Sequence, residues 1–453
     1  MTDELTVIGS GPGGYVAAVL ASKKGLDVTV IEKSEIGGVC TNHGCIPSKA
    51  LLSTSEKIES IKGAKREGID VRFEGVDFQK VMSKKERAVK VSQKAIDSLF
   101  EENDIEVIEG TGKIVGPGKV KVNGDIIGSD NIIIATGSKP MSLPGIDIDG
   151  EDILSSKDIL ALEEVPDSLL IIGGGYIGLE MAYVYSAMGS EVIIVELMDR
   201  LLPNMDKDLS DVAEQMMKRK RIRFYTGSKV TDIEKADPLE VHLEGEIEKS
   251  IEVEKVLCSV GRRPTPPESD LELSRDDGHI EVDEMMKTGF EGIYAVGDVN
   301  GESMLAHSAF KQAEIAVKDI VGEYTDGFDQ SKVPAGIYTH PEMASIGLTE
   351  EEAEEENDVK IGKYPISATG RGSSTGERMG LAKIIADSEG HILGAHLACP
   401  GATDIIMECS VALEKDMTAE ELGEIIHPHP TYSEAIKEAA ENVSGVSVHS
   451  TGK

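Results

Sequence analysis

At 453 residues, the chain is long enough for two to four domains, each with its own core. The formal charge of −36 argues against binding to nucleic acid or to an anionic membrane, because phosphate contacts need clusters of Lys and Arg. Five cysteines without dense spacing exclude a secreted disulfide scaffold. No leader or membrane-spanning stretch is recognisable in the sequence. We therefore expect a cytoplasmic protein. Two explanations of the acidity stay open: a solvated surface suited to a saline cytoplasm, and a docking surface for a basic partner.

A glycine-rich pattern occurs twice. An apolar strand beginning at Thr6 runs into G-x-G-x-x-G, and a second strand ends in an acidic residue 21 positions after the second glycine. The same order returns 164 residues later. The two sets are Gly9, Gly11, Gly14 and Glu32, then Gly173, Gly175, Gly178 and Glu196. Such glycines permit a tight turn, close approach to a pyrophosphate and helix–strand packing, while the acid accepts a ribose hydroxyl. Ordinary turn glycines would not explain equal spacing in both copies, so we predict two dinucleotide-binding units.

Two cysteines, Cys40 and Cys45, follow the first unit. If they pair, they cannot share an ideal helix, because five residues rise about 7.5 Å along the axis and a disulfide reaches about 7 Å between Cα atoms. Gly37, Gly38 and Gly44 provide the freedom to bend the chain. Pro47 then suits the first turn of a helix, whose positive end stabilises a thiolate. The segment indicates a redox-active dithiol.

Later segments extend both units and then change character. Apolar spacing between Leu51 and Leu99, interrupted near 63–77, predicts two helices beside the first sheet. Further strands are expected from Ile132, Val256 and Ile293. From about residue 333 we expect an α+β region without a nucleotide pattern, entered through Asp326–Lys332. Its predicted strands are Ala335–Tyr338, Ser345–Leu348, Leu381–Ala386 and His391–Ala398, and its predicted helices are Thr403–Leu413 and Ser433–Glu441. Glu350–Asp358 should be a surface helix or loop, and Val443–Lys453 an extended or poorly ordered tail.

A late motif, His427-Pro-His429-Pro-Thr-Tyr-Ser-Glu434, offers an acid–base group. Taken alone, such a tract is more often a turn or a loose metal site. Thiol–disulfide exchange, however, needs a base to move protons, and the upstream cysteine pair makes catalysis the better explanation. We assign no metal site. Cys258, Cys399 and Cys409 lie in apolar segments and should be buried as small hydrophobic residues.

Together, the cysteine segment, the two glycine units and the late His–Glu motif resemble the FAD-dependent pyridine nucleotide–disulfide oxidoreductases, in the right order from Gly9 to Glu434. The resemblance implies an α/β protein with two Rossmann-like domains, FAD- and NAD-binding, and an α+β dimerisation domain at the C-terminus. We expect the FAD-binding domain over residues 1–147, completed by 273–330, the NAD-binding domain over 148–272 and the dimerisation domain over 331–453.

The resemblance also implies roles for individual residues. Cys45 would contact the flavin and Cys40 would exchange with the substrate. His429 would be the base, oriented by Glu434, and would reach the cysteines of the other subunit of a homodimer. Lys49 and Glu180 would pair near the flavin, although each could instead be an ordinary surface charge, and Tyr176 could either cover the nicotinamide pocket or pack in the core. The FAD-binding set is Gly9, Gly11, Gly14, Glu32, Lys49, Thr136, Gly137, Asp298 and Ala306. The NAD-binding set is Gly173, Gly175, Tyr176, Gly178, Glu180, Glu196 and Gly261.

The activity implied is oxidation of dihydrolipoamide to lipoamide with NAD⁺ as the acceptor. Glu196 favours NAD over NADP, since a carboxylate repels a 2′-phosphate. Lipoamide, or a lipoyl domain of a 2-oxoacid dehydrogenase or glycine cleavage complex, would be the partner. Reduction of another small disulfide, as in glutathione reductase, and reduction of mercury remain alternatives, as does a non-enzymatic subunit that only holds FAD.

Overall fold

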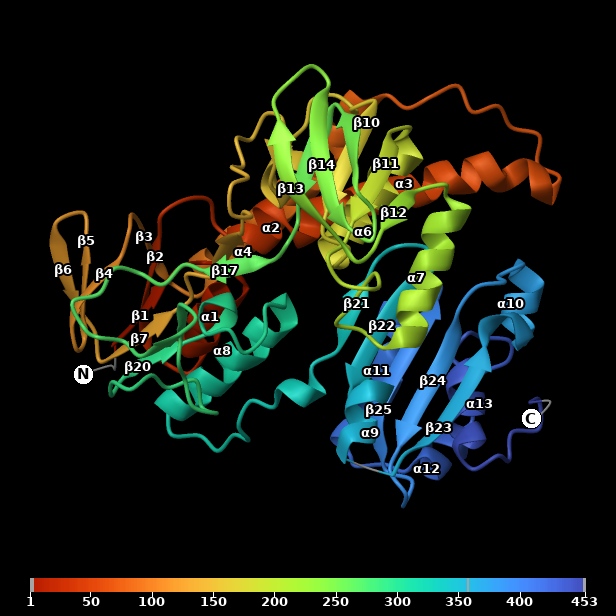
Figure 1. Ribbon diagram of the computed structural model, residues 1–453. Helices are drawn as coiled ribbons and strands as arrows, with labels where there is room; N and C mark the ends of the chain where they lie inside the picture. Colours follow the sequence, from red (N-terminus) through yellow and green to blue (C-terminus); the bar gives the residue numbers. More distant parts are fainter. Residues whose placement is uncertain (1–3, 357, 451–453) are drawn as a thin grey trace.

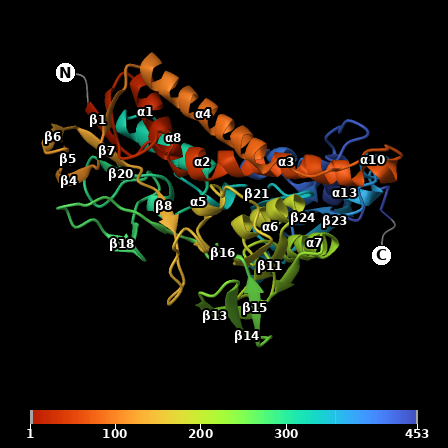
Figure 2. The ribbon, with the colours of Figure 1, turned by 90° about the horizontal axis from the view of Figure 1, so that it is seen from above.

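A computed structural model describes residues 4–356 and 358–450. The chain forms three large sheets of five strands each (Figures 1 and 2). The first two are parallel, and their central strands are buried on both faces, which explains why those strands are apolar almost throughout. Among the described residues, no helix is both long and apolar enough to cross a membrane.

The first sheet has the strand order β20-β7-β1-β2-β3. Its strands are β1 (Glu4–Ile8), β2 (Asp27–Glu32), β3 (Glu106–Glu109), β7 (Asn131–Ile134) and β20 (Ile293–Ala295). Helices α1 (Pro12–Lys23) and α8 (Ala306–Ile320) cover one face, and a small sheet of β4 (Lys113–Gly116), β5 (Lys119–Val122) and β6 (Asp125–Gly128) covers the other. Because β20 pairs with β7, a late segment of the chain completes this first sheet, as the resemblance implied.

The second sheet repeats the first, with the order β12-β11-β10-β16-β9. Its strands are β9 (Ile153–Leu154), β10 (Ser168–Ile172), β11 (Glu191–Val195), β12 (Arg223–Tyr225) and β16 (Lys255–Cys258). Helices α6 (Tyr176–Met188) and α7 (Lys207–Arg219) pack on one face, and β13 (Ser228–Glu234), β14 (Leu239–Gly245) and β15 (Lys249–Val253) on the other. Both units therefore have the same three layers. The small three-stranded sheets were not predicted from the sequence.

The third sheet is antiparallel, in the order β21-β22-β25-β24-β23. Its strands are β21 (Ala335–Ile337), β22 (Glu342–Gly347), β23 (Lys360–Pro365), β24 (Leu381–Ala386) and β25 (Ile392–Cys399). Helices α11 (Ala402–Glu414), α12 (Ala419–Gly423) and α13 (Glu434–Val443) pack against it. The strand predicted at Ser345–Leu348 is the second half of β22, which starts earlier because its pairing with β25 begins at Glu342. Strand β23 was missed because Lys360, Gly362, Lys363 and Pro365 hide its alternation.

Two long helices join these parts. The predicted pair appears as α3 (Cys45–Gly63) and α4 (Phe78–Glu102), which pack against each other. Helix α3 extends from the first sheet towards the C-terminal sheet (Figure 2). The remaining short elements are α2 (Gly38–His43), α5 (Ser156–Ile159), β8 (Ser138–Pro140), β17 (Arg262–Pro264), β18 (Arg275–Asp276), β19 (His279–Ile280), α9 (Glu350–Glu356), α10 (Gly370–Thr375) and the 3₁₀ turns Ala64–Glu67, Gly297–Val299, Gln330–Lys332 and Ile366–Ala368. The tail expected at 443–453 begins after α13, and residues 451–453 lie outside the described part of the chain.

Candidate active site

Cys40 and Cys45 form a disulfide with their Cα atoms 4.7 Å apart. Cys40 lies in α2, whereas Cys45 is the first residue of α3. The helices are separated at Gly44, whose backbone angles (φ −147°, ψ −109°) are not helical. A Cβ atom at Gly44 would lie 3.0 Å from the carbonyl oxygen of Val39 and 3.3 Å from the Cα of Cys40. The structure confirms that the pair does not share one helix, and it shows that a side chain at the break would crowd the backbone of α2.

The position of Cys45 suits a thiolate. As the first residue of a 19-residue helix, it lies where unpaired N–H groups and the helix macrodipole favour negative charge. Pro47 lies in the same first turn, where its missing N–H breaks no helical hydrogen bond. Cys258, Cys399 and Cys409 are unpaired and buried, as predicted, and burial raises the pKa of each thiol. Of the five cysteines, only Cys40 and Cys45 line the large cavity described next.

Both cysteines border a cavity of about 680 Å³. The first glycine loop, the acid Glu32 and segments far along the chain complete its wall. The predicted residues that line it are Gly9, Gly11, Glu32, Lys49, Thr136, Gly137, Asp298, Ala306 and Glu180. Thr136 has a buried hydroxyl oxygen without a hydrogen-bond partner among the described residues. A cavity of this volume with a glycine loop, an acid and an unsatisfied hydroxyl fits a dinucleotide such as FAD.

Gly14 does not line the cavity, but it has the packing role expected of the third glycine. A Cβ there would lie 1.9 Å from the carbonyl oxygen of Gly9, so α1 could not approach β1. Gly178 has the same role in the second unit, where a Cβ would lie 2.0 Å from the carbonyl oxygen of Gly173. Gly173 and Gly261 have positive φ angles of 104° and 119°, and Gly175 directly precedes α6. The two glycine loops are therefore alike in structure as well as in sequence.

The two acids bind their glycine loops in the same way. Glu32 accepts hydrogen bonds from the N–H groups of Ser10 (2.8 Å) and Ser34 (2.9 Å). Glu196 accepts from the N–H groups of Gly174 (2.6 Å) and Met198 (2.8 Å). A carboxylate has about four acceptor positions, so Glu196 keeps capacity for a ribose hydroxyl beside the loop.

Lys49 and Glu180 pair, as the resemblance implied. The Lys49 ammonium lies 3.0 and 3.1 Å from the two carboxylate oxygens of Glu180, although 131 positions separate the residues. Glu180 also accepts the backbone N–H of Tyr338 (3.2 Å), and the Lys49 ammonium lies 4.4 Å from the centre of the Tyr338 ring. Helices α3 and α6 and the residue directly after strand β21 of the third sheet therefore meet at this pair. Tyr176, at the start of α6, is partly buried, and burial raises the pKa of its hydroxyl.

Arg262 and Ser138 also belong to the site, although neither was predicted from the sequence. Arg262 donates to the Ser138 hydroxyl (2.7 Å) and carbonyl (2.9 Å) and lies 3.7 Å from the Asp298 carboxylate, which the Ser138 hydroxyl also contacts. Burial lowers the pKa of Arg262, and Asp298 opposes that shift. The run Gly261-Arg-Arg-Pro264 after a strand was visible in the sequence, but only the fold places it beside Asp298.

His429 and Glu434 form the predicted pair, with 2.7 Å between Nδ1 and Oε1. Burial disfavours the charged form of Glu434, but the Thr431 N–H and the His429 ring outweigh it and hold the Glu434 pKa below its usual value. His427 instead contacts Glu408 and the carbonyl of Ile425. The His429 side chain is 72% exposed, and neither residue lines the cavity with the cysteines. Helix α2, which contains Cys40, and helix α13, which begins at Glu434, lie apart in both views (Figures 1 and 2).

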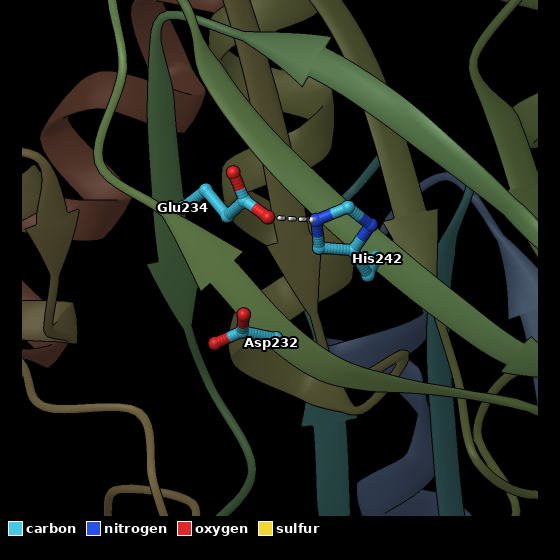
Figure 3. Close-up of side chains that lie close together, drawn as sticks. All are labelled: Asp232, Glu234 and His242. Atoms are coloured by element: carbon cyan, nitrogen blue, oxygen red, sulfur yellow. Dashed lines mark hydrogen bonds and ion pairs between the residues drawn. The ribbon is translucent and has the colours of Figure 1, made fainter.

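Elsewhere in the described residues, three potential metal ligands lie close together. Asp232, Glu234 and His242 stand on the solvent-facing side of the β13–β14 hairpin, with potential ligand atoms within 4.8 Å of one another (Figure 3). His242 is held by Glu234 (3.2 Å) and Ser250 (2.8 Å). These contacts account for the orientation of the imidazole, and we assign no metal to the group.

Comparison with known proteins extends over nearly the full chain. Residues 3–313 match the family described as pyridine nucleotide-disulphide oxidoreductase, and residues 333–440 match its dimerisation domain. Dihydrolipoyl dehydrogenase 2 of Haloarcula marismortui is 39% identical, with 98% of each chain covered. Dihydrolipoyl dehydrogenase of Bacillus subtilis is also 39% identical, over 98% of this chain and 99% of that one. The crystal structure of LpdA from Mycobacterium tuberculosis has a TM-score of 0.90 at 25% identity, covering 98% of this chain and 100% of that chain.

Proposed function

Because the chain belongs to the pyridine nucleotide–disulphide oxidoreductase family, we propose that it catalyses dihydrolipoamide + NAD⁺ → lipoamide + NADH + H⁺. The observation that carries the proposal is the Cys40–Cys45 disulfide in the wall of a dinucleotide-sized cavity built on the first glycine unit. Full-length relatives that are named dihydrolipoyl dehydrogenase support the choice of substrate.

The cofactors are FAD and NAD, and we propose a separate binding unit for each. The first glycine loop, with Glu32, Thr136, Gly137, Asp298 and Ala306, would hold FAD. The second loop, with Glu196 and Gly261, would hold NAD. Support comes from the three-layer architecture that both units share. It comes also from the backbone N–H of each glycine loop, which donates to Glu32 in the first unit and to Glu196 in the second. When bound, FAD supplies the two-electron step between the dithiol and the nicotinamide.

The cysteines and a base would perform the thiol chemistry. His429 takes a proton from a substrate thiol, while Glu434 accepts the hydrogen bond from Nδ1 and stabilises the imidazolium. The substrate thiolate attacks Cys40, and Cys45 leaves as a thiolate at the start of α3. The second substrate thiol then attacks the substrate sulfur that is bound to Cys40 and displaces Cys40. The two substrate sulfurs form the lipoamide disulfide, and Cys40 and Cys45 are left as the dithiol.

A homodimer would complete the active site. The C-terminal residues match a dimerisation domain, and His429 is exposed at a distance from the cysteines of its own chain. We propose that His429 and Glu434 of each subunit serve the cysteine pair of the other. A lipoyl domain of a larger complex is the proposed carrier of the substrate. A cytoplasmic location is also proposed, supported by three unpaired cysteines.

Substrate choice is tested by steady-state rates with dihydrolipoamide and NAD⁺, and with glutathione disulfide, CoA disulfide and Hg(II) in the presence of NADH or NADPH. The proposal expects dihydrolipoamide and NAD⁺ to give the highest kcat/KM. Cys45→Ser should abolish lipoamide turnover while NADH still reduces the flavin, and the buried Cys258→Ser control should retain turnover. Faster reduction of another disulfide, or full lipoamide activity in Cys45→Ser, would contradict it.

A further inference from the structure

Ser10 joins the two halves of the FAD-side site through one buried hydroxyl. The residue follows Gly9 and is fully buried. Its hydroxyl donates to the Glu32 carboxylate (2.7 Å) and accepts the backbone N–H of Gly37 (3.2 Å). A serine hydroxyl has one donor, and here that donor goes to the acid, while the oxygen accepts from the segment that leads to the cysteines.

The Gly37 end of this connection fixes where the redox segment begins. Gly37 directly precedes α2, which contains Cys40, and has a left-handed backbone (φ 94°). Gly38 packs against the first glycine loop so closely that an added Cβ would lie 2.6 Å from the Cα of Gly11. The start of α2 is therefore held on the glycine loop by one backbone contact and by the Ser10 hydroxyl.

The second unit provides an internal comparison. Its matching residue is Gly174, whose N–H reaches Glu196 (2.6 Å) just as the Ser10 N–H reaches Glu32 (2.8 Å). Binding of the acid to the loop thus needs no hydroxyl. The hydroxyl is present only in the unit whose acid is followed by the cysteine segment. The Ser10 hydroxyl therefore occurs where the glycine loop must also hold that segment, through the Gly37 N–H.

We propose that Ser10 is a positioning residue that couples Glu32, the acid at the dinucleotide cavity, to the start of the helix that carries Cys40. Through Ser10, a ligand bound at Glu32 and the geometry of the redox segment stabilise each other. The inference relies on the proposed function only for the role of the disulfide, and its test needs no lipoamide turnover.

The test is hydrogen–deuterium exchange on the FAD-bound, full-length protein with Ser10→Ala. Loss of the acceptor for the Gly37 N–H should speed exchange over residues 37–44 by about threefold to tenfold, the effect of one hydrogen bond. The disulfide–dithiol equilibrium, measured in dithiothreitol redox buffers by trapping the thiols, should shift towards the dithiol by a similar factor, because the reduced segment gains freedom.

Ser34→Ala is the matched control. The Ser34 hydroxyl also donates to Glu32 (3.3 Å), but it makes no hydrogen bond to Gly37. This variant should leave both the exchange of 37–44 and the thiol equilibrium at wild-type values. Ser10→Gly, which copies Gly174, is a second variant that only removes atoms and should reproduce Ser10→Ala.

Three results would overturn the proposal. Exchange over 37–44 within twofold of wild type in Ser10→Ala would show that the hydroxyl does not hold the segment. If Ser34→Ala sped exchange over 37–44 as much as Ser10→Ala does, the effect would come from the lost contact with Glu32 and not from the Gly37 hydrogen bond. Equal acceleration at the second glycine loop, 173–178, would indicate general loss of stability. If the Ser10 and Ser34 variants gave the expected exchange rates and thiol equilibria but the wild-type protein did not turn over lipoamide, only the proposed substrate would be refuted.

Discussion

Glu32 and Glu196 show how a single carboxylate organises a binding loop before any ligand arrives. Each accepts one N–H from its glycine loop and another from two residues further along the chain. The sequence predicted these acids as ribose acceptors, from their position after the second strand. Their contacts with the loop suggest a second role, which is to fix the loop conformation in advance. A loop that is already held by hydrogen bonds loses less conformational entropy when a dinucleotide binds.

His429 is the residue whose removal should affect the chemistry most directly. His429→Gln keeps a polar side chain but cannot take a proton, so dithiol oxidation should fall about 10²–10⁴-fold while FAD stays bound. Stopped-flow reduction by dihydrolipoamide measures the step. The matched control is His449→Gln, since His449 pairs with Glu438 at the same distance of 2.7 Å. A loss smaller than about threefold in His429→Gln would place the base elsewhere.

His427 should make stability depend on pH. Its contact with Glu408 raises the pKa of the ring in the native state, against the opposing effect of burial. A raised native pKa stabilises the fold fully below the unfolded value of about 6.5, and this stabilisation is lost as pH rises through the native value. The difference in free energy of unfolding between wild type and His427→Gln should therefore shrink as the pH rises above about 6.5. Denaturant titrations measure it, and a difference that grows with pH would contradict the assignment.

At the scale of elements, helix α13 depends on a glycine in the strand beneath it. Strand β23 contacts α13 directly, and a Cβ at Gly362 would lie 1.9 Å from the carbonyl oxygen of Ala439 and 2.6 Å from the backbone nitrogen of Val443. The strand was missed in the sequence because glycine and lysines interrupt its apolar pattern. Gly362, which interrupts the apolar pattern of β23, is therefore also the residue that allows α13 to approach the strand.

Gly362→Ala should therefore displace the helix that begins at Glu434. Overpacking against backbone costs about 1–3 kcal/mol or more, so the midpoint of thermal unfolding should fall and the His429–Glu434 pair should be disturbed. Calorimetry and lipoamide turnover measure the two effects. Gly128→Ala, at a glycine with nothing within 4 Å of an added Cβ, should change neither. An unchanged midpoint in Gly362→Ala would mean that α13 does not rest on β23 as described.

At the scale of the whole molecule, the proposed reacting groups of one chain lie in different places. The cysteines line the cavity beside the first glycine loop, whereas His429 is exposed and does not line that cavity. If the base acts across a symmetric dimer, each active site takes cysteines from one subunit and His429 from the other.

Mixing two inactive variants tests this arrangement. Cys45→Ser subunits keep a working base, and His429→Gln subunits keep working cysteines, so each mixed dimer has one intact site. Random exchange of equal amounts should restore about a quarter of the wild-type turnover, because half the dimers are mixed and each has one of two sites. Each variant alone is the control. No recovery, despite mixed dimers detected by native mass spectrometry, would show that the base serves its own chain.

The sequence by itself determined the two glycine units, the acids that end their second strands and the cysteine pair, because each depends on residues that are neighbours along the chain. Strand, turn and helix start are local structures, and their residue types and spacings are visible without a fold. Only the tertiary structure decided which distant groups meet. It placed Lys49 beside Glu180, Arg262 beside Asp298 and Ser10 beside Gly37, and it left His429 exposed and outside the wall of the cavity that holds the cysteines. Such contacts depend on how sheets and helices pack, and packing involves the whole chain at once.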